Sequence, residues 1–310
     1  MKKNWFLKTC SAMILAAAMF AGSGAAVMAE EETYEETEAV EAGAETAEAG
    51  TEAAGELPNS FIIYISGIDV FGDVETQSRS DVNLLMAVNR SEGKVLLVNT
   101  PRDYYVELPI SEGQKDKLTH AGIYGVDVSK GAMEMLYNVP IDYYARLNFS
   151  SFETIIDAMG GIEVYSEFPF VAEGYEYVEG MNSLNGAQAL AFVRERKSFA
   201  EGDIQRGKDQ MIMLKAMIEK LGTFEGAAAI ASVYDEVAPV VQTNMTKDML
   251  VGLSAEQIVS GRPWEVETYY VTGTDGSEVT YSIPGANAYV MIPNDEEVAE
   301  GTEKLLAVLE

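Results

Sequence analysis

Cations gather in a short stretch of a chain that is otherwise strongly acidic. Arg194, Arg196, Arg206 and Lys208 lie within 17 residues, whereas the whole chain of 310 residues carries a formal charge of −29. The planar guanidinium group donates two parallel hydrogen bonds, so arginine suits the binding of phosphate or carboxylate. Gln210 adds a further donor at the end of this stretch. The stretch therefore predicts an anion-binding site.

Two aspartates form a second candidate site. Asp69 comes just after one apolar run, and Asp81 just before the next. If these runs are adjacent strands, the two carboxylates meet at one edge of a sheet, where paired hard oxygen ligands suit Mg²⁺ (or Mn²⁺). The alternative is that both residues cap turns and strand ends, a common role for aspartate.

A third candidate is the tripeptide Pro101-Arg102-Asp103, which directly follows another apolar run. An arginine at the carboxyl end of a strand lies where open α/β sheets place their ligands. The alternative is an ordinary surface ion pair, which contributes little to stability. The tripeptide alone does not separate the two interpretations.

Short apolar runs alternate with helical patterns along residues 57–310, which predicts a layered α/β domain with helices on both faces of a central sheet. Continuous Ile, Val and Leu runs are typical of strands that are buried on both faces. The predicted strands are 61–68, 83–88, 95–99, 162–164 and 264–271, and the predicted helices are 129–137, 149–159 and 296–309.

The cation-rich stretch is expected to join a strand to a helix. A strand over Ala189–Val193 would lead into Arg194 and Arg196 and, because strand side chains alternate, would place both on one face. A solvated, charged first helical turn does not explain these two arginines.

The helix that follows is expected to start near Asp203, which can act as its cap. Asp203, Arg206 and Gln210 would then lie along one side of the helix. The positive end of a helix dipole next to Arg and Gln side chains is suited to binding phosphate. The alternative is a capped helix with a solvated charged turn.

The first 56 residues differ in composition from the rest. Residues 1–29 combine Lys2, Lys3 and Lys8 with an uncharged apolar stretch, which predicts a cleavable export signal or, alternatively, a membrane anchor. Residues 30–56 carry 11 Glu and no Lys or Arg, which predicts a disordered acidic spacer. Residues 57–310 are expected to form one domain with a formal charge of −21.

Several classes of function are disfavoured by composition. The acidic balance argues against nucleic acid as a partner. Cys10, the only cysteine, lies within the predicted signal, so the mature protein would have no thiol nucleophile and no cysteine-based metal site. His120 is the only histidine, and we expect it to have a structural role rather than a catalytic one.

The order and spacing of these motifs resemble the LytR-CpsA-Psr (LCP) family of bacterial cell-wall proteins. The resemblance covers about residues 61–221. The motifs that carry it are Gly67-Ile68-Asp69, Arg79-Ser80-Asp81, Pro101-Arg102-Asp103, the block from Lys117 to Ala121, Asn148-Phe149, the block from Gly160 to Val164, the block from Leu184 to Leu190, and the run from Arg194 to Gln210.

The resemblance implies an extracytoplasmic phosphotransferase that moves a glycopolymer from a polyprenyl-pyrophosphate carrier at the outer face of the membrane onto peptidoglycan. It also implies a three-layer α-β-α fold with a central mixed sheet and an apolar groove for the lipid. By the same resemblance, metal binding falls on Asp69 and Asp81. Pyrophosphate binding falls on Arg79, Arg102, Lys117, Arg194, Arg196, Arg206 and Gln210, and catalysis on Asp81, Arg102 and Asp203.

Two other functions remain open on the sequence. A noncatalytic protein that binds lipid-linked or anionic glycopolymer would use the same arginines, but it would not need a metal-binding pair of aspartates. A transcription attenuator is disfavoured by the predicted export, by the net charge and by the lack of a recognisable DNA-reading helix.

Overall fold

The computed structural model describes residues 57–310, except 201, 224–227, 229–231, 233 and 235–236. The predicted signal (1–29) and acidic spacer (30–56) lie outside the described residues. In the described part of the chain, no helix is long and apolar enough to cross a membrane.

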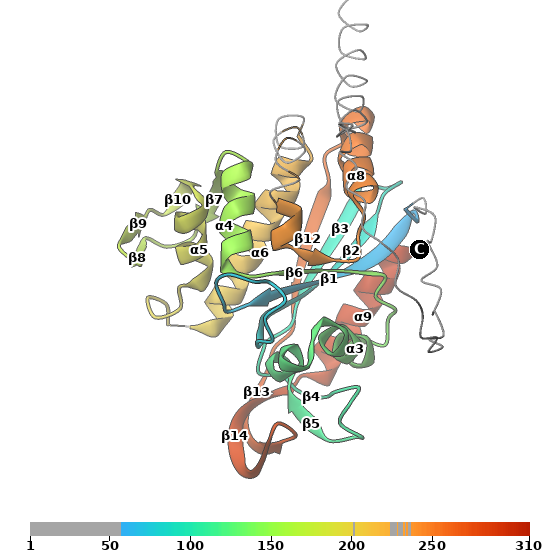
Figure 1. Ribbon diagram of the computed structural model, residues 1–310, viewed down its shortest axis with the longest axis vertical. Coiled ribbons are helices and arrows are strands. Elements are labelled where there is room, and N and C mark those ends of the chain that lie inside the picture. Colours follow the sequence, from blue (N-terminus) through green and yellow to red (C-terminus); the bar gives the residue numbers. More distant parts are fainter. Residues whose placement is uncertain (1–56, 201, 224–227, 229–231, 233, 235–236) are drawn as a thin grey trace, which may run out of the picture. The chain divides into compact units, whose positions relative to one another are not determined.

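A six-stranded mixed sheet forms the centre of the domain (Figure 1). Its strand order is β11-β6-β1-β2-β3-β12. The antiparallel pairs are β1–β2, β2–β3 and β11–β6, and the parallel pairs are β1–β6 and β3–β12. The strands span Ser60–Ile68 (β1), Ser80–Asn89 (β2), Lys94–Asn99 (β3), Tyr143–Leu147 (β6), Gln242–Thr243 (β11) and Glu265–Tyr270 (β12).

Residues of β1 alternate between two hydrophobic clusters, one on each face of the sheet. Ile62 and Tyr64 belong to a cluster with residues of α2, α3 and α9. Phe61 and Ile63 belong to a cluster on the other face, to which α6 and α8 contribute. The helices span Leu118–Ala121 (α2), Val126–Tyr137 (α3), Asp203–Leu221 (α6), Lys247–Ser260 (α8) and Asp295–Leu309 (α9). This arrangement confirms the predicted layered fold, since apolar side chains on both faces need a cover on each side.

A third cluster joins α6 to α4 (Phe149–Ala158), α5 (Gly186–Arg194) and two small sheets. These sheets pair β7 (Ile162–Ser166) with β10 (Gly180–Leu184) and β8 (Phe170–Ala172) with β9 (Tyr175–Tyr177). On the other side of the domain, β4 (Tyr105–Glu107) pairs with β5 (Lys115–Lys117), and β13 (Gly273–Thr280) with β14 (Ile283–Pro293). Two short 3-10 turns, η1 (Gly122–Tyr124) and η2 (Ala238–Val240), complete the described elements.

The predicted strand over Ala189–Val193 is wrong, because these residues belong to α5. The Asn185 side chain accepts a hydrogen bond from the backbone N–H of Gln188, and the Gln188 side chain accepts one from the backbone N–H of Asn185. This capping box starts the helix at Gly186, which carries residues 189–193 into helical geometry. The other predicted strands and helices are confirmed, with ends that differ by a few residues.

Gly122 lets the chain after α2 pack directly against the start of β2. A Cβ atom at this position would lie 2.5 Å from the backbone nitrogen of Ser80 and 2.6 Å from the carbonyl oxygen of Ser78. Its φ of −61° is ordinary for any residue, so glycine is needed here for space and not for backbone freedom. The contact fixes the backbone immediately before Asp81.

We expect Gly122→Ala to lower the free energy of unfolding by about 1–3 kcal/mol, because the added methyl group meets backbone atoms that cannot rotate away. Gly252→Ala is the control, since nothing lies within 4 Å of a Cβ at that position in α8. Alanine there should be neutral, or stabilising by up to about 1 kcal/mol. Urea unfolding of both variants measures the difference, and equal stability would contradict the proposed close approach.

Candidate active site

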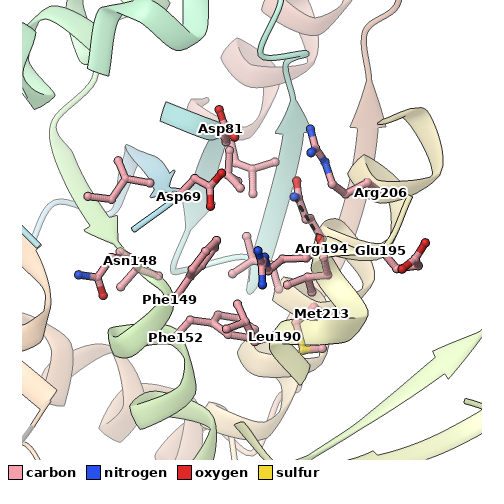
Figure 2. A pocket seen from close by; sticks show the side chains of 18 of the residues that line it. Asp69, Asp81, Asn148, Phe149, Phe152, Leu190, Arg194, Glu195, Arg206 and Met213 are labelled. Atoms are coloured by element: carbon pink, nitrogen blue, oxygen red, sulfur yellow. Dashed lines mark hydrogen bonds between the residues drawn. The ribbon is translucent and has the colours of Figure 1, made fainter. Parts of the chain in front are cut away.

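A cavity of about 500 Å³ opens beside the ends of β1 and β2, between the sheet and α4, α5 and α6. Its lining divides into a charged part and an apolar part (Figure 2). Asp69, Asp81, Arg194 and Arg206 surround the charged part in Figure 2. The apolar part includes Ile68, Phe149, Phe152, Leu190, Met213 and Met217. The cavity can therefore hold a molecule with an anionic group on an apolar chain.

Asp81 and Arg102 form an ion pair within this cavity. The Nη1 of Arg102 donates to Oδ2 of Asp81 at 2.8 Å, and the hydroxyl of Thr119 donates to Oδ1 at 2.9 Å. The side chains of Asp81 and Arg102 are 14% and 21% exposed, so the pair is largely shielded from solvent. The backbone N–H of Thr119 also donates to the carbonyl of Arg102 at 2.8 Å. Three segments of the chain are thus joined at one carboxylate.

A β-bulge turns Asp81 toward the cavity. Gly67 pairs with Val82 and Ile68 with Ser80, so Asp81 is an extra residue in β2 without a partner in β1. Asp81 and Val82 both line the cavity although they are neighbours in the sequence. A regular strand would send them to opposite faces, whereas a bulge re-aims one side chain.

Asp69 is exposed and follows the last residue of β1, as predicted. It lines the cavity together with Asp81, so the structure places both predicted metal ligands at one site. Across residues 57–310, as far as they are described, no group of three or more His, Cys, Asp or Glu side chains could hold a metal ion. Two carboxylates are nevertheless enough for Mg²⁺ when a bound phosphate supplies further oxygens.

Arg194 lies at the end of α5, where it touches both acidic and aromatic groups. Its Nη1 is 2.7 Å from Oε1 of Glu173 in the turn between β8 and β9. Its guanidinium also lies 4.3 Å from the ring centroid of Phe149, a cation–π contact. The ring of Phe149 in turn meets that of Phe71 edge-on at 5.0 Å. Arginine at this position is held at the boundary between the apolar and charged parts of the cavity.

Arg196, Arg206 and Gln210 complete the predicted anion-binding group, and all three line the cavity. Gln210 donates from Nε2 to the carbonyl of Val193 at 3.4 Å, which ties α6 to the end of α5. The cap at the start of α6 is Gly202, not Asp203 as predicted, and no side chain caps this helix. Asp203 is its first residue, and its side chain lies outside the described residues.

Two predicted cations do not line the cavity. Lys117 is 2.9 Å from Oδ1 of Asp103 and lies 5.4 Å from the ring centroid of Tyr289. It therefore neutralises Asp103 beside the Arg102 segment instead of facing the cavity. Arg79 is exposed, one residue before the buried Ser80, and is likewise absent from the lining.

Glu195 lines the cavity and also orders a turn. Its Oε1 accepts the backbone N–H of Ser198 at 2.8 Å. Partial burial raises the pKa of Glu195, but hydrogen bonds from Ser198 and from the backbone N–H groups of Lys197 and Arg196 outweigh burial and leave it below its usual value. The carboxylate thus stays ionised while it orders the segment that carries Arg196.

His120 has the structural role that the sequence predicts. It is buried, and its Nδ1 lies 2.7 Å from Oδ1 of the buried Asp116. Asp116 also accepts the backbone N–H of Ser282 at 2.9 Å, which anchors the turn between β13 and β14. Burial raises the pKa of Asp116, and its hydrogen bonds to His120 and Ser282 lower it further than burial raises it.

Sequence reasoning missed three residues at this site: Thr119, Glu173 and Lys197, the last an exposed cation that lines the cavity. Thr119 lies in a motif block that the sequence analysis did single out, but nothing in the sequence indicates that its hydroxyl reaches Asp81. Glu173 is separated from Arg194 by 21 residues, and only the folded β8–β9 turn brings the two together.

Comparisons with known proteins agree with this geometry. A sequence model of the LytR_cpsA_psr family matches residues 23–305. This chain belongs to the LytR_cpsA_psr family.

A relative from Bacillus mycoides, named polyisoprenyl-teichoic acid--peptidoglycan teichoic acid transferase TagU, is 35% identical over 61% of this chain. The aligned region is also 61% of that relative's length. A TagU of the same full name from Halalkalibacterium halodurans is 30% identical over 81% of this chain and 79% of its own.

Solved structures show the same fold. The crystal structure of B. subtilis TagV is 28% identical, with a TM-score of 0.68 over 81% of this chain and 97% of that chain. The structure described as TagT bound to LIIa-WTA is 27% identical, with a TM-score of 0.66 over 84% of this chain and 95% of that one. These likenesses confirm the three-layer fold expected for the family.

A buried carboxyl group lies in α6 directly before Gln210. Asp209 is 3% exposed, and its Oδ1 accepts a hydrogen bond from Nε2 of Gln205 at 2.9 Å. Its Oδ2 is buried without a hydrogen-bond partner among the described residues. Burial, with a smaller contribution from the charge of Glu167, raises the pKa of Asp209 to about 7 despite the bond from Gln205.

This pKa makes the stability of the domain depend on pH. The unfolded chain ionises Asp209 near pH 4 and the folded chain only near pH 7, so stability falls as the pH rises through this window. Asp209→Asn should be more stable than the wild type by about a few kcal/mol at pH 8, with the gain disappearing toward pH 4. Urea unfolding at several pH values measures it. Exposed Glu303→Gln serves as the control, and a gain that is independent of pH would contradict the assignment.

Proposed function

We propose that this protein transfers a glycopolymer from a polyprenyl-pyrophosphate carrier to peptidoglycan, at the outer face of the membrane or in the cell wall. The observation that carries the proposal is the single cavity that joins an apolar lining to Arg102, Arg194 and Arg206. A lipid tail and a pyrophosphate need these two surroundings side by side. The relatives' names, teichoic acid transferases that act on a polyisoprenyl-linked substrate, support the same reaction.

The reaction we propose breaks one bond of the pyrophosphate. A hydroxyl oxygen of the acceptor bonds to the phosphorus that carries the polymer, and polyprenyl phosphate leaves with the bridging oxygen. Arg102, Arg194, Arg196 and Arg206 are suited to stabilise the charge that develops on the transferring and leaving phosphates. The proton of the acceptor hydroxyl goes to a base, for which Asp81, Asp203 or a substrate phosphate are the candidates.

The residues present fit a divalent ion. Asp81 has both oxygens committed to Arg102 and Thr119, which leaves further lone pairs, and exposed Asp69 lies at the same end of the cavity. We propose that these two carboxylates hold Mg²⁺ (or Mn²⁺) when the pyrophosphate is bound, in keeping with the preference of Mg²⁺ for one or two carboxylates and substrate phosphates. The ion would neutralise phosphate charge.

A variant of Asp81 distinguishes transfer of the glycopolymer from binding of the lipid-linked substrate alone. The mature domain, incubated with Mg²⁺, a lipid-linked oligosaccharide and peptidoglycan, should form the glycan–peptidoglycan conjugate. Asp81→Asn should slow conjugate formation by about 10²- to 10³-fold, the effect typical of losing one preorganised charged group, while the lipid-linked substrate still binds. Wild-type protein that binds this substrate without forming the conjugate would instead support a noncatalytic binder.

Lipid retention tests separately whether the arginines of the cavity bind the phosphates of the carrier. We expect the purified domain to retain polyprenyl phosphate or pyrophosphate, and Arg206→Ala and Arg194→Ala to reduce the amount because they remove charge beside the bound phosphates. Lys304→Ala is the matched control, since this cation lies on α9 and pairs with Glu300 outside the cavity lining. Lipid extraction with mass spectrometry measures retention. Equal lipid in the Arg206→Ala and Lys304→Ala proteins would contradict the assignment.

A further inference from the structure

Acidic residues dominate the two segments that border the charged part of the cavity, which we call the rim. The first rim segment, residues 69–79 between β1 and β2, contains three acids and one base, Arg79. The second, residues 162–180, contains five glutamates and no lysine or arginine. Asp69 and Glu173 belong to these segments and line the cavity, so the rim meets it directly. All eight rim acids are exposed.

The rim also neutralises the cation nearest to it. Arg194, which is 38% exposed in its side chain, pairs at 2.7 Å with Glu173 at the tip of the β8–β9 turn. The other glutamates of this segment include Glu176 and Glu179. The segment itself, residues 162–180, contains no lysine or arginine that could pair with them. Exposed carboxylates therefore border a cavity whose lining also includes the exposed cations Arg194, Arg196 and Lys197.

This arrangement of charge bears on what can extend out of the cavity. If the pyrophosphate end of a carrier-linked polymer is bound among the arginines, the polymer itself must pass the rim to reach solvent. A polymer with a phosphate in each repeat would bring its charges within about 8 Å, the Debye length at physiological salt, of the rim carboxylates. Repulsion between like charges at that distance lowers the affinity for an anionic polymer, and so it discriminates against polymers of that kind. Residues 57–310 as a whole carry −21, of which the eight acids and one base of the rim account for −7. The remaining −14 adds to the repulsion.

An uncharged glycan does not meet this penalty. Its hydroxyl groups can donate hydrogen bonds to the exposed carboxylates. An ionised carboxylate accepts hydrogen bonds and donates none, so hydroxyl groups suit it. We propose that the polymer handled by this protein is an uncharged glycan and not a polyanion of the teichoic acid type. The inference rests on the proposed function, since it needs the pyrophosphate end of the polymer in the cavity. It sets this chain apart from relatives whose names specify teichoic acid.

The test compares two synthetic carriers with the same short polyprenyl pyrophosphate, one bearing an uncharged oligosaccharide and the other an oligo(glycerol phosphate) of equal length. Binding to the mature protein is measured at constant Mg²⁺ in about 20 mM and about 500 mM salt. At low salt the uncharged carrier should bind about 10-fold or more tightly than the polyanion, and high salt should shrink this ratio because it screens the rim.

A pair of double variants locates the effect. Glu176→Gln with Glu179→Gln removes two rim charges that do not line the cavity. Glu296→Gln with Glu303→Gln removes two exposed charges from α9, which Figure 1 shows well apart from β8 and β9. At low salt, the rim variant should reduce the ratio of the two affinities, uncharged carrier over polyanionic carrier, several-fold. The α9 variant should leave this ratio nearly unchanged, because salt screening limits the distance over which each charge acts.

The outcomes separate this inference from the proposed function. Equal or tighter binding of the polyanion at low salt would overturn the choice of an uncharged polymer and leave the transferase assignment in place. Equal narrowing by both double variants would overturn the role of the rim. Binding of neither carrier, in a protein that is folded by circular dichroism, would overturn the proposed function and this inference with it.

Discussion

The ion pair between Asp81 and Arg102 is the interaction on which the rest of the site depends. It joins β2 to the segment after β3, and Thr119 adds α2 through the second oxygen of the same carboxylate. Because the pair is largely shielded from water, loss of either partner would leave a poorly compensated charge. The hydrogen bond from the backbone N–H of Thr119 to the carbonyl of Arg102 joins the two backbones, in addition to the side-chain contacts. Charge and backbone geometry are therefore fixed together at the end of the sheet.

The two parts of the cavity come from different layers of the fold. The carboxylates and Arg102 are supplied by residues at or near the ends of β1, β2 and β3, the inner strands of the central sheet. The apolar lining comes mainly from α4, α5 and α6, whose packing also forms the third hydrophobic cluster. Arg194 joins the two parts, since it lies against Phe149 on one side and reaches Glu173 on the other. In a site of this kind the sheet positions the charged groups, while the surrounding helices provide the apolar surface for a lipid chain.

Much of this could be predicted from the sequence because the signals are local. Continuous apolar runs identified the central strands, and motif order identified the residues around the cavity. The error at Ala189–Val193 arose because a short apolar run has no readable period, although the Asn185–Gln188 capping box was available as evidence. Lys117 and Arg79 lie outside the cavity lining, which could not be read from the sequence because residue order does not show where a cation points. Thr119 and Glu173 depend on contacts between distant segments, which no local pattern reports.

The extra residue in β2 has a consequence for how this site tolerates change in chain length. Side chains of a strand alternate between faces, so removing one position at the bulge would rotate the carboxylate of Asp81 away from Arg102 and into the opposite layer. The connection between β1 and β2 is also held in place, since the carbonyls of Gly72 and Thr76 accept hydrogen bonds from Asn148 and Arg146. Insertions and deletions should therefore be tolerated least at this irregular pairing.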